Sequence, residues 1–356
     1  MDKVRTAICG TGFISAIHAG ALRKCPECDL VAVYSRDKKR GEQFGDKFSI
    51  PEVFTDYNEM VASTEIDAVL IGVPNDLHKD FCVRAANRGK HVFVEAPLCL
   101  TLAEADEMIS ACRRAGVVLF YGENIIFAPM FAKALQLVEE EAVGEVFLVK
   151  HRRSVVPHAD WYWDANRTGG GVFIELGCHG IEFARKVLGK RSIETVFLNC
   201  GIFVHRGRTS AEDDSIMVIT FDGGARAVIE NSWAQRGGAE NRIEIYGFDG
   251  VIFADLINGT SLRTYSEKGT GGSSRGGGWT ISPYNEEFLY GYPDELGHFI
   301  RCCQGIEKPT ETGEDGKVIL ETIFAGYESA RSGKVVKLPF NPPPDKKPIE
   351  LWKKLK

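Results

Sequence analysis

The sequence predicts an α/β chain of two domains, a parallel-sheet domain followed by an α+β domain with a predominantly antiparallel sheet. Short apolar runs alternate with helix-like stretches through the first third of the chain, a pattern typical of βαβ units. After about residue 122, strand-like runs follow one another across short turns, which favours antiparallel pairing. The length of 356 residues suits two domains of ordinary size.

The parallel-sheet domain is expected to span residues 1–122. Its strands are predicted from apolar runs bounded by turn residues, and its helices from the charged or amphipathic stretches between them. The predicted strands are 4–9, 30–34, 67–72, 91–94 and 117–120, and the predicted helices lie near 13–24, 37–48, 76–89 and 101–115. Right-handed crossovers of this kind bury both faces of the sheet.

The second domain is expected over residues 123–340, with a Pro- and Lys-rich C-terminal arm at 341–356. Asp222, Gly223 and Gly224 predict a hairpin turn. Predicted strands are 145–155, 192–204, 215–221, 225–233 and 242–246, and predicted helices are 129–141, 169–188, 286–304 and 315–332. The last two helices either cover the sheet or return to the first domain. The glycine-rich segment 269–278 is either a lid or a long connection.

Composition excludes several functional classes. The formal net charge of −6 argues against nucleic acid and against an anionic membrane surface as partners. No run reaches the ~18 apolar residues of a membrane helix, and charges interrupt the N-terminus at once, so we expect a cytoplasmic protein. Ten cysteines do not form a disulfide scaffold at this size. Cys25 and Cys28 lack a second ligand pair, so no metal is expected.

The first strand is followed by a glycine-rich turn that opens a helix, Gly10-Thr11-Gly12-Phe13-Ile14-Ser15. This is the context that a dinucleotide-binding fingerprint requires. The first glycine permits a tight turn, the second lets the backbone approach a pyrophosphate, and the helix N-terminus offers unpaired N–H groups to the anion. The sequence therefore predicts a nicotinamide dinucleotide as cofactor.

The end of the second strand is where the adenosine ribose is expected. NAD enzymes usually place an acid there, but this strand ends in Ser35 and Arg36, with Asp37 two places late. A serine beside an arginine suits a 2′-phosphate, so NADP is preferred over NAD. The alternative is that these residues are solvated charges at the start of a helix.

Three further segments carry a resemblance to a known family. They are residues 73–78 (VPNDLH), 89–98 (GKHVFVEAPL) and 169–179 (GGGVFIELGCH). With the glycine turn, they make the sequence similar to the glucose–fructose oxidoreductase, inositol dehydrogenase and rhizopine catabolism (Gfo/Idh/MocA) family over about residues 4–340.

The resemblance implies a Rossmann domain, an open-faced antiparallel sheet domain and an active site between them. It also implies hydride transfer between nicotinamide and a carbinol carbon of a sugar or polyol, and a homodimer or homotetramer. Together with the motifs, it assigns cofactor binding to Gly10, Thr11, Gly12, Phe13, Ile14, Ser35, Arg36, Pro74, Asn75, His78, Glu95, Ala96 and Asn124.

Two departures from the family pattern bear on catalysis. The lysine that the family places after its glutamate is Ala96 here, and the aspartate of its glycine-led helix is Glu175. His179 remains, one helical turn after Glu175, on the same helix face. We therefore predict His179 as the acid–base group, with Glu175 as its partner or as a substrate ligand. The alternative is that His179 is a packed structural histidine.

Substrate contacts are predicted from polar and aromatic residues near the glycine-led helix. Lys150 and Arg152 alternate with His151 and Arg153, so only one of these pairs faces the site, and the sequence does not say which. Asp213 and Asp214 precede a strand and are expected in a solvated turn. The predicted substrate-binding residues are Arg152, His158, Tyr162, Trp163 and Tyr292.

Three functions remain open at this point. The first is an NAD(P)-dependent oxidoreductase acting on a secondary alcohol of a sugar, polyol or glycoside. The second follows from the missing lysine at Ala96: a redox-neutral enzyme that cleaves a glycoside through a transient keto-sugar, with tightly bound NAD. The third is a non-catalytic regulator that senses nicotinamide dinucleotides. Substrate identity and reaction direction are not predicted.

Overall fold

The computed structural model describes residues 3–157, 159–235, 239–257, 262–266, 278–282 and 289–352. For residues 262–266 and 278–282 it describes the backbone alone. The chain forms two compact units. The first contains residues 1–124 and 292–318, and the second contains residues 125–291 and 319–356. The predicted helix near 286–304 thus returns to the first unit.

The first unit is built on a six-stranded sheet in which every neighbouring pair is parallel. The strand order is β3-β2-β1-β4-β5-β6. The strands are β1 Val4–Cys9, β2 Cys28–Tyr34, β3 Glu52–Phe54, β4 Ala68–Ile71, β5 His91–Glu95 and β6 Leu119–Gly122. The prediction of a parallel sheet built from βαβ units is confirmed. The order reverses direction between β1 and β4, which is where such sheets bind their ligands.

Local signals in the sequence set the helices of the first unit. Thr101 and Glu104 form a reciprocal capping box at the start of α5, and Gly116 ends that helix in the left-handed region, φ 66°. Helix α1 packs on α9, and α4 packs on α5. The helices are α1 Phe13–Leu22, α2 Lys38–Phe48, α3 Tyr57–Ala62, α4 His78–Ala86, α5 Leu102–Ala115 and α9 Tyr292–Cys303.

The second unit is built on a nine-stranded mixed sheet of order β14-β13-β12-β11-β7-β10-β9-β8-β15. Its strands are β7 Val146–Ser154, β8 Ile193–Gly201, β9 Asp214–Phe221, β10 Arg226–Ser232, β11 Glu240–Gly247, β12 Gly250–Asp255, β13 Leu262–Ser266, β14 Gly278–Ser282 and β15 Val336–Lys337. All neighbours are antiparallel except β7 and β10. A parallel pair needs a long crossover, and the segment from α8 through β9 supplies it.

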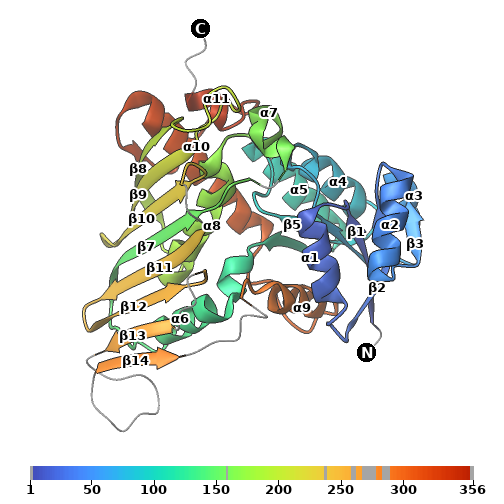
Figure 1. Ribbon diagram of the computed structural model, residues 1–356, viewed down its shortest axis with the longest axis horizontal. Helices are drawn as coiled ribbons and strands as arrows, with labels where there is room; N and C mark the ends of the chain where they lie inside the picture. The colour runs from blue at the N-terminus through green and yellow to red at the C-terminus, as the bar shows by residue number, and fades with distance from the viewer. Residues whose placement is uncertain are drawn as a thin grey trace. The chain divides into compact units, whose positions relative to one another are not determined.

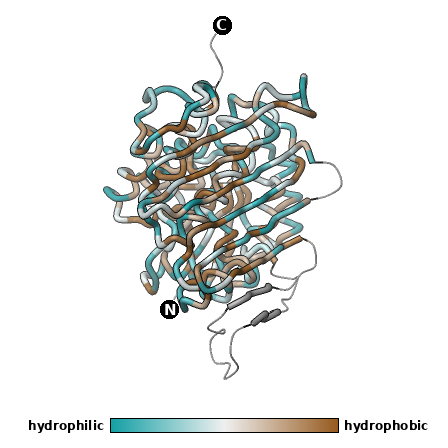
Figure 2. Tube along the Cα trace, turned by 90° about the vertical axis from the view of Figure 1, so that its left-hand side faces the viewer, coloured by the Kyte–Doolittle hydropathy of each residue, from teal (hydrophilic) through white to brown (hydrophobic). Residues whose placement is uncertain are grey.

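Helices cover one face of this sheet. Helix α8 Val172–Val187 lies on β7 and β10, and α6 Pro129–Glu139 lies near β12 (Figure 1). Figure 2 looks onto the opposite face, where hydrophilic and hydrophobic residues alternate along the strands. Phe197 and Ile216 on this open face expose 37% and 48% of their surface. The prediction of an open-faced, predominantly antiparallel sheet is confirmed.

Several elements differ from the sequence-based expectations. Strand β3 and helix α3 are too short to give a periodic signal, and neither was predicted. The helix expected from residue 169 begins at Val172, because Gly169 ends the short helix α7 Ala165–Thr168 with φ 85°. In the C-terminal segment, α11 Ile349–Trp352 is held by a hydrogen bond from the Ile349 N–H to the Gly169 carbonyl, 2.9 Å. The segment 269–277 lies outside the described residues.

Helix α10 Gly313–Ser332 begins in the first unit and ends in the second. No helix in the described part of the chain is both long and apolar enough to span a membrane.

Candidate cofactor and substrate sites

The predicted cofactor-binding residues gather at one edge of the first sheet. They follow the carboxyl ends of β1, β2, β4, β5 and β6, which are consecutive in the sheet. Because the strands are parallel, these ends lie at the same edge. Pro74 precedes the short 3₁₀ helix Asn75–Leu77, and Asn124 opens another, Asn124–Phe127. Both Asn75 and Asn124 are buried.

The turn between β1 and α1 has the geometry of a pyrophosphate cradle. Gly10 has φ 106°, and a Cβ at this position would lie 3.0 Å from the Gly72 carbonyl oxygen, so a larger residue is disfavoured. Gly12 is the N-cap of α1, and no side chain caps this helix. The N-terminus of α1 therefore carries no side-chain cap that would compete with an anion. These residues fit a dinucleotide.

The residues after β2 leave no acid positioned for a ribose 2′-hydroxyl. The Ser35 hydroxyl donates to the Asp37 carbonyl, 2.9 Å, and Ser35 is buried. The Asp37 carboxylate accepts from the Arg40 N–H and caps α2. Arg36 is exposed, and no ion pair found among the described residues includes it.

His78 and Glu95 serve contacts inside the first unit. The His78 ring lies between two carbonyl oxygens, 3.0 Å from Pro97 and 2.8 Å from Val73, and burial lowers its pKa. The neutral ring can donate its one N–H to only one of these carbonyls, and the predicted contact of His78 with the cofactor stays a prediction. Glu95 Oε1 lies 2.6 Å from Nε2 of the fully buried His18. His18 was not predicted, because one histidine in an apolar helix gives no recognisable signal.

In the second unit, the N-terminus of α8 is capped by a side chain from far along the chain. Glu212 Oε1 accepts from the N–H groups of Gly171 and Phe173, both at 3.0 Å, and from the Tyr327 hydroxyl at 2.7 Å. A Cβ on Gly171 would lie 2.0 Å from the Glu212 carbonyl oxygen, and one on Gly170 would lie 2.1 Å from the Tyr327 hydroxyl. The glycine motif is therefore required for this cap.

The acidic run at 212–214 corrects an expectation. Asp213 is fully buried, not in a solvated turn, and its carboxylate accepts from the N–H groups of Phe203, Val204 and His205 at 2.7–2.8 Å. Burying a carboxylate is tolerated when several donors converge on it. Glu212 and Asp213 thus anchor α8 and the 203–205 segment to the start of β9.

Glu212 leads to a prediction about stability and pH. Burial raises its pKa from 4.5 to about 7, although the Tyr327 hydroxyl and the backbone donors favour the ionised form. Because the folded-state pKa is raised, its stabilising contribution is full below pH 4.5 and is lost as pH rises through about 7. We expect Glu212→Gln to remove about 3 kcal/mol of this pH dependence. Urea unfolding at pH 5 and pH 7.5 measures it.

The matched control for this prediction is Glu230→Gln on the open face, which should leave the pH dependence of the wild type intact. Identical pH slopes for the wild type and Glu212→Gln would contradict the prediction.

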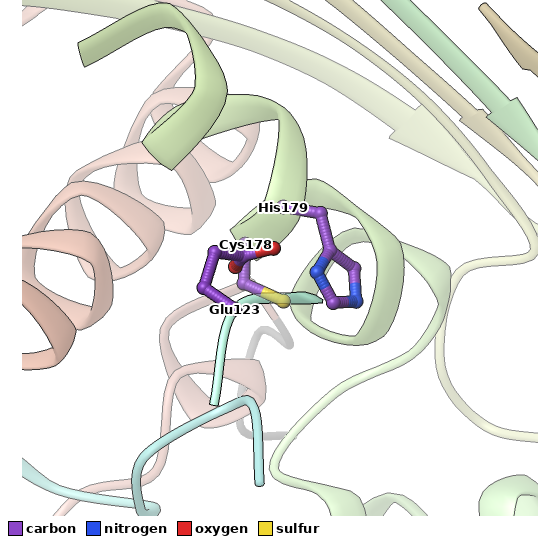
Figure 3. Close-up of side chains that lie close together, drawn as sticks. All are labelled: Glu123, Cys178 and His179. Atoms are coloured by element: carbon purple, nitrogen blue, oxygen red, sulfur yellow. The ribbon is translucent and has the colours of Figure 1, made fainter. Parts of the chain in front are cut away.

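Helix α8 carries the predicted catalytic pair. Glu175 Oε2 accepts from the Trp233 indole N–H, 2.7 Å, and burial raises the pKa of Glu175 to about 6 against the effects of Arg153 and Trp233. His179 leaves the same helix one turn later, next to Cys178 (Figure 3), and is 8% exposed. Glu175 is thus held by Trp233, and its predicted role as the partner of His179 or as a substrate ligand stays a prediction.

Strand β7 presents different residues on its two faces. His151 and Arg153 face α8: a Cβ on Gly180 of α8 would lie 2.7 Å from His151 Nδ1. Burial, followed by the charges of Arg153 and His179, lowers the pKa of His151 to about 3, so it stays neutral near neutral pH. Lys150 and Arg152 face the open side.

Arg152 is therefore on the opposite face from the one carrying His179. It forms ion pairs with Glu230, 2.9 Å, and Glu240, 2.8 Å. The prediction that Arg152 contacts the substrate is therefore corrected. Arg153 is the arginine of β7 that faces α8, and the sequence alone could not tell which of the two arginines would do so.

The aromatic residues near the start of α8 mostly serve packing. Trp163 is 7% exposed and packs with Trp233, ring centroids 5.3 Å apart, while Arg208 covers its ring at 4.1 Å. The rings of Trp161 and Tyr162 stack on each other, 3.9 Å between centroids. His158 lies outside the described residues.

Tyr292 belongs to the first unit, where it begins α9. Its ring lies edge-on to His18, 6.0 Å between centroids. Its predicted role in substrate binding stays a prediction.

Comparison with known proteins identifies the family. The profile of an oxidoreductase family with an NAD-binding Rossmann fold matches residues 4–123, and the profile of the GFO/IDH/MocA C-terminal domain matches residues 131–253. Myo-inositol 2-dehydrogenase of Thermotoga maritima is 31% identical over 339 residues, covering 94% of this chain and 98% of that protein. The chain belongs to the GFO/IDH/MocA oxidoreductase family.

Two other similar proteins bear on the cofactor. D-xylose 1-dehydrogenase (NADP(+)) 2 of Haloferax volcanii is 28% identical, covering 93% of this chain and 98% of that protein. The crystal structure of GenD2 from gentamicin A biosynthesis, in complex with NAD, superposes with a TM-score of 0.85 at 28% identity, covering 96% of this chain and 97% of that one. Family membership confirms the prediction of an NAD(P)-dependent dehydrogenase.

Proposed function

We propose that this chain transfers a hydride between a nicotinamide dinucleotide and a secondary alcohol of a sugar, polyol or glycoside, with His179 as the acid–base group. The nicotinamide supplies the hydride chemistry when bound. The protein must then hold the alcohol and move its hydroxyl proton. The observation that carries the proposal is α8, which the Glu212 cap fixes and which presents Glu175 and His179 one turn apart.

His179 is the proposed proton carrier because two other candidate positions are unsuited to the task. Position 96 is alanine and holds no proton. His151 remains neutral near neutral pH. Glu175, held by Trp233, is proposed as a substrate ligand that accepts a hydroxyl hydrogen bond when it is ionised.

Absorbance at 340 nm tests the proposal. The protein is mixed with NAD or NADP and a panel of inositols, aldoses, polyols and glycosides, and net reduction of the cofactor is the expected result. Glycoside cleavage without net reduction would instead support the redox-neutral alternative, which Ala96 favours because the usual proton-carrying lysine is absent.

The proposed cofactor preference is NADP over NAD. Arg36 is exposed beside the buried Ser35, and Asp37 is occupied in capping α2. We expect calorimetric titration to give tighter binding of NADP, and Arg36→Ala to weaken NADP about tenfold, or about 1.4 kcal/mol, with little effect on NAD. Lys47→Ala, in the last turn of α2, is the control. NAD binding tenfold tighter than NADP in the wild type would refute the preference.

The proposed assembly is a homodimer or larger symmetric oligomer formed through the open sheet face. Apolar side chains exposed there, such as Phe197 and Ile216, are typical of an interface. Light scattering should give at least twice the chain mass of 39.3 kDa at micromolar concentration. Ile216→Lys should weaken the assembly, whereas Val335→Lys, outside the sheet, should not. A mass of one chain for the wild type would contradict this prediction.

A further inference from the structure

A row of polar side chains crosses the α8 side of the second sheet. Arg153 on β7 is in register with Asn231 on β10 and with Asn241 on β11, and Asn231 is in register with Ser215 on β9. The four residues are thus neighbours across four adjacent strands. The Asn231 amide oxygen lies 3.2 Å from where a Cβ on Gly177 would be, so the row runs beneath α8.

Most hydrogen-bonding groups of this row are buried and unused. Ser215, Asn231 and Asn241 are at most 2% exposed. Both polar atoms of the Asn231 amide, Asn241 Nδ2, the Ser215 hydroxyl and Arg153 Nη1 have no hydrogen-bond partner among the described residues. A buried polar group without a partner costs about 1–3 kcal/mol, so proteins rarely keep several together unless a ligand or water satisfies them.

The neighbouring arginine shows that Arg153 is unusual. Arg152 makes ion pairs with Glu230 and Glu240 on the open face. No ion pair in the described structure includes Arg153, although its charge acts on His151, Glu175 and Tyr290. The carboxyl group on which the charge of Arg153 acts is that of Glu175, which accepts a hydrogen bond from the Trp233 indole N–H.

The chemistry of the row favours a ligand rich in acceptors. Arg153 and the two asparagine amides supply donors, and the guanidinium fork matches the two oxygens of a carboxylate.

We propose that Arg153 binds a carboxylate of the substrate, with Asn231 and Asn241 beside it, so that the substrate is a sugar acid and not a neutral sugar. The inference rests on the proposed function for its assignment to the substrate. Arg153 is two residues after His151 on the same face of β7, and a Cβ on Gly180, the residue after His179, would lie 2.7 Å from His151 Nδ1. The carboxylate anchor and the proposed acid–base group therefore lie near the same imidazole ring. One monosaccharide acid can then present its carboxylate to Arg153 and a hydroxyl to His179.

Calorimetry on the NAD- or NADP-loaded protein tests this inference. The probes are D-glucuronate and D-galacturonate, compared with D-glucose and D-galactose. We expect the acids to bind at least about tenfold more tightly than the matched neutral sugars. Arg153→Met should abolish that difference, Arg153→Lys should keep part of it, and Arg152→Met is the matched control that should keep all of it. Melting temperatures verify that each variant is folded.

The possible outcomes separate the inference from the proposed function. Equal binding of acids and neutral sugars, an acid preference that survives in Arg153→Met, or no binding of any probe overturns the inference. Arg153-dependent binding of acids without any change at 340 nm supports the inference and counts against the proposed dehydrogenase reaction. Turnover of neutral sugars that Arg153→Met leaves unchanged supports the reaction and overturns the inference.

Discussion

His179→Ala is expected to lower kcat by at least about 10², with cofactor affinity nearly unchanged. General acid–base assistance is typically worth about 10²–10⁴ in rate, and Ala96 cannot supply it. Cofactor affinity should be retained because the predicted dinucleotide-binding residues belong to the first unit, whereas His179 belongs to the second. Steady-state kinetics on a substrate found by the 340 nm screen, with calorimetry of cofactor binding, gives both quantities.

The matched control is Cys178→Ala, the preceding residue of α8, which should change kcat by no more than a few fold. Glu175→Gln should have a smaller effect than His179→Ala and should remove the acidic limb of the pH–rate profile near pH 6, where burial places the pKa of Glu175. If His179→Ala keeps a near-normal kcat, another residue is the base, and Tyr162 is the first candidate to test. Lys150 is a poor alternative because it pairs with Glu244, 3.1 Å, on the open face. Loss of cofactor binding would make His179 structural.

The strands of the first unit were predictable because parallel strands buried on both faces read as continuous apolar runs. Val4–Cys9 was predicted to the residue, and the glycine turn after it fixed where β1 ends. By contrast, β3 Glu52–Phe54 has three residues, which is too short for any periodicity to be recognised. The strand β12 Gly250–Asp255 was also not predicted, although residues 251–254 form an apolar run.

The candidate site was predictable where a motif fixes the backbone and unpredictable where distant segments meet. Alternation along β7 showed that Arg152 and Arg153 point to opposite faces, but only the pairing of β7 with β10 and β11 beneath α8 decides which one faces α8. Asp213 and Asp214 were expected in a solvated turn because acids are seldom buried, and Glu212 was not predicted to have any role. The N–H groups that donate to the Glu212 and Asp213 carboxylates belong to Gly171, Phe173 and the 203–205 segment. These donors are distant in sequence, so the local sequence does not predict them.

Gly171→Ala is expected to destabilise the second unit by about 3–5 kcal/mol and to lower its melting temperature by about 10 °C. The added Cβ would lie 2.0 Å from the Glu212 carbonyl oxygen and 2.9 Å from its nitrogen, both of them backbone atoms. The backbone has little freedom to retreat, because the Gly171 and Phe173 N–H groups bond the Glu212 carboxylate and the Val172 N–H bonds its carbonyl, all at 3.0 Å.

The same substitution should lower activity, since α8 carries both Glu175 and His179 and can relieve the clash only by moving away from Glu212. Differential scanning calorimetry, kinetics and cofactor titration on one preparation separate the effects: kcat falls while cofactor affinity in the first unit persists. Gly20→Ala in α1 is the control, because a Cβ there meets nothing within 4 Å and alanine favours helix. A Gly171→Ala protein with wild-type melting temperature and kcat would show that the Glu212 cap does not fix α8, and the argument that places His179 would fail with it.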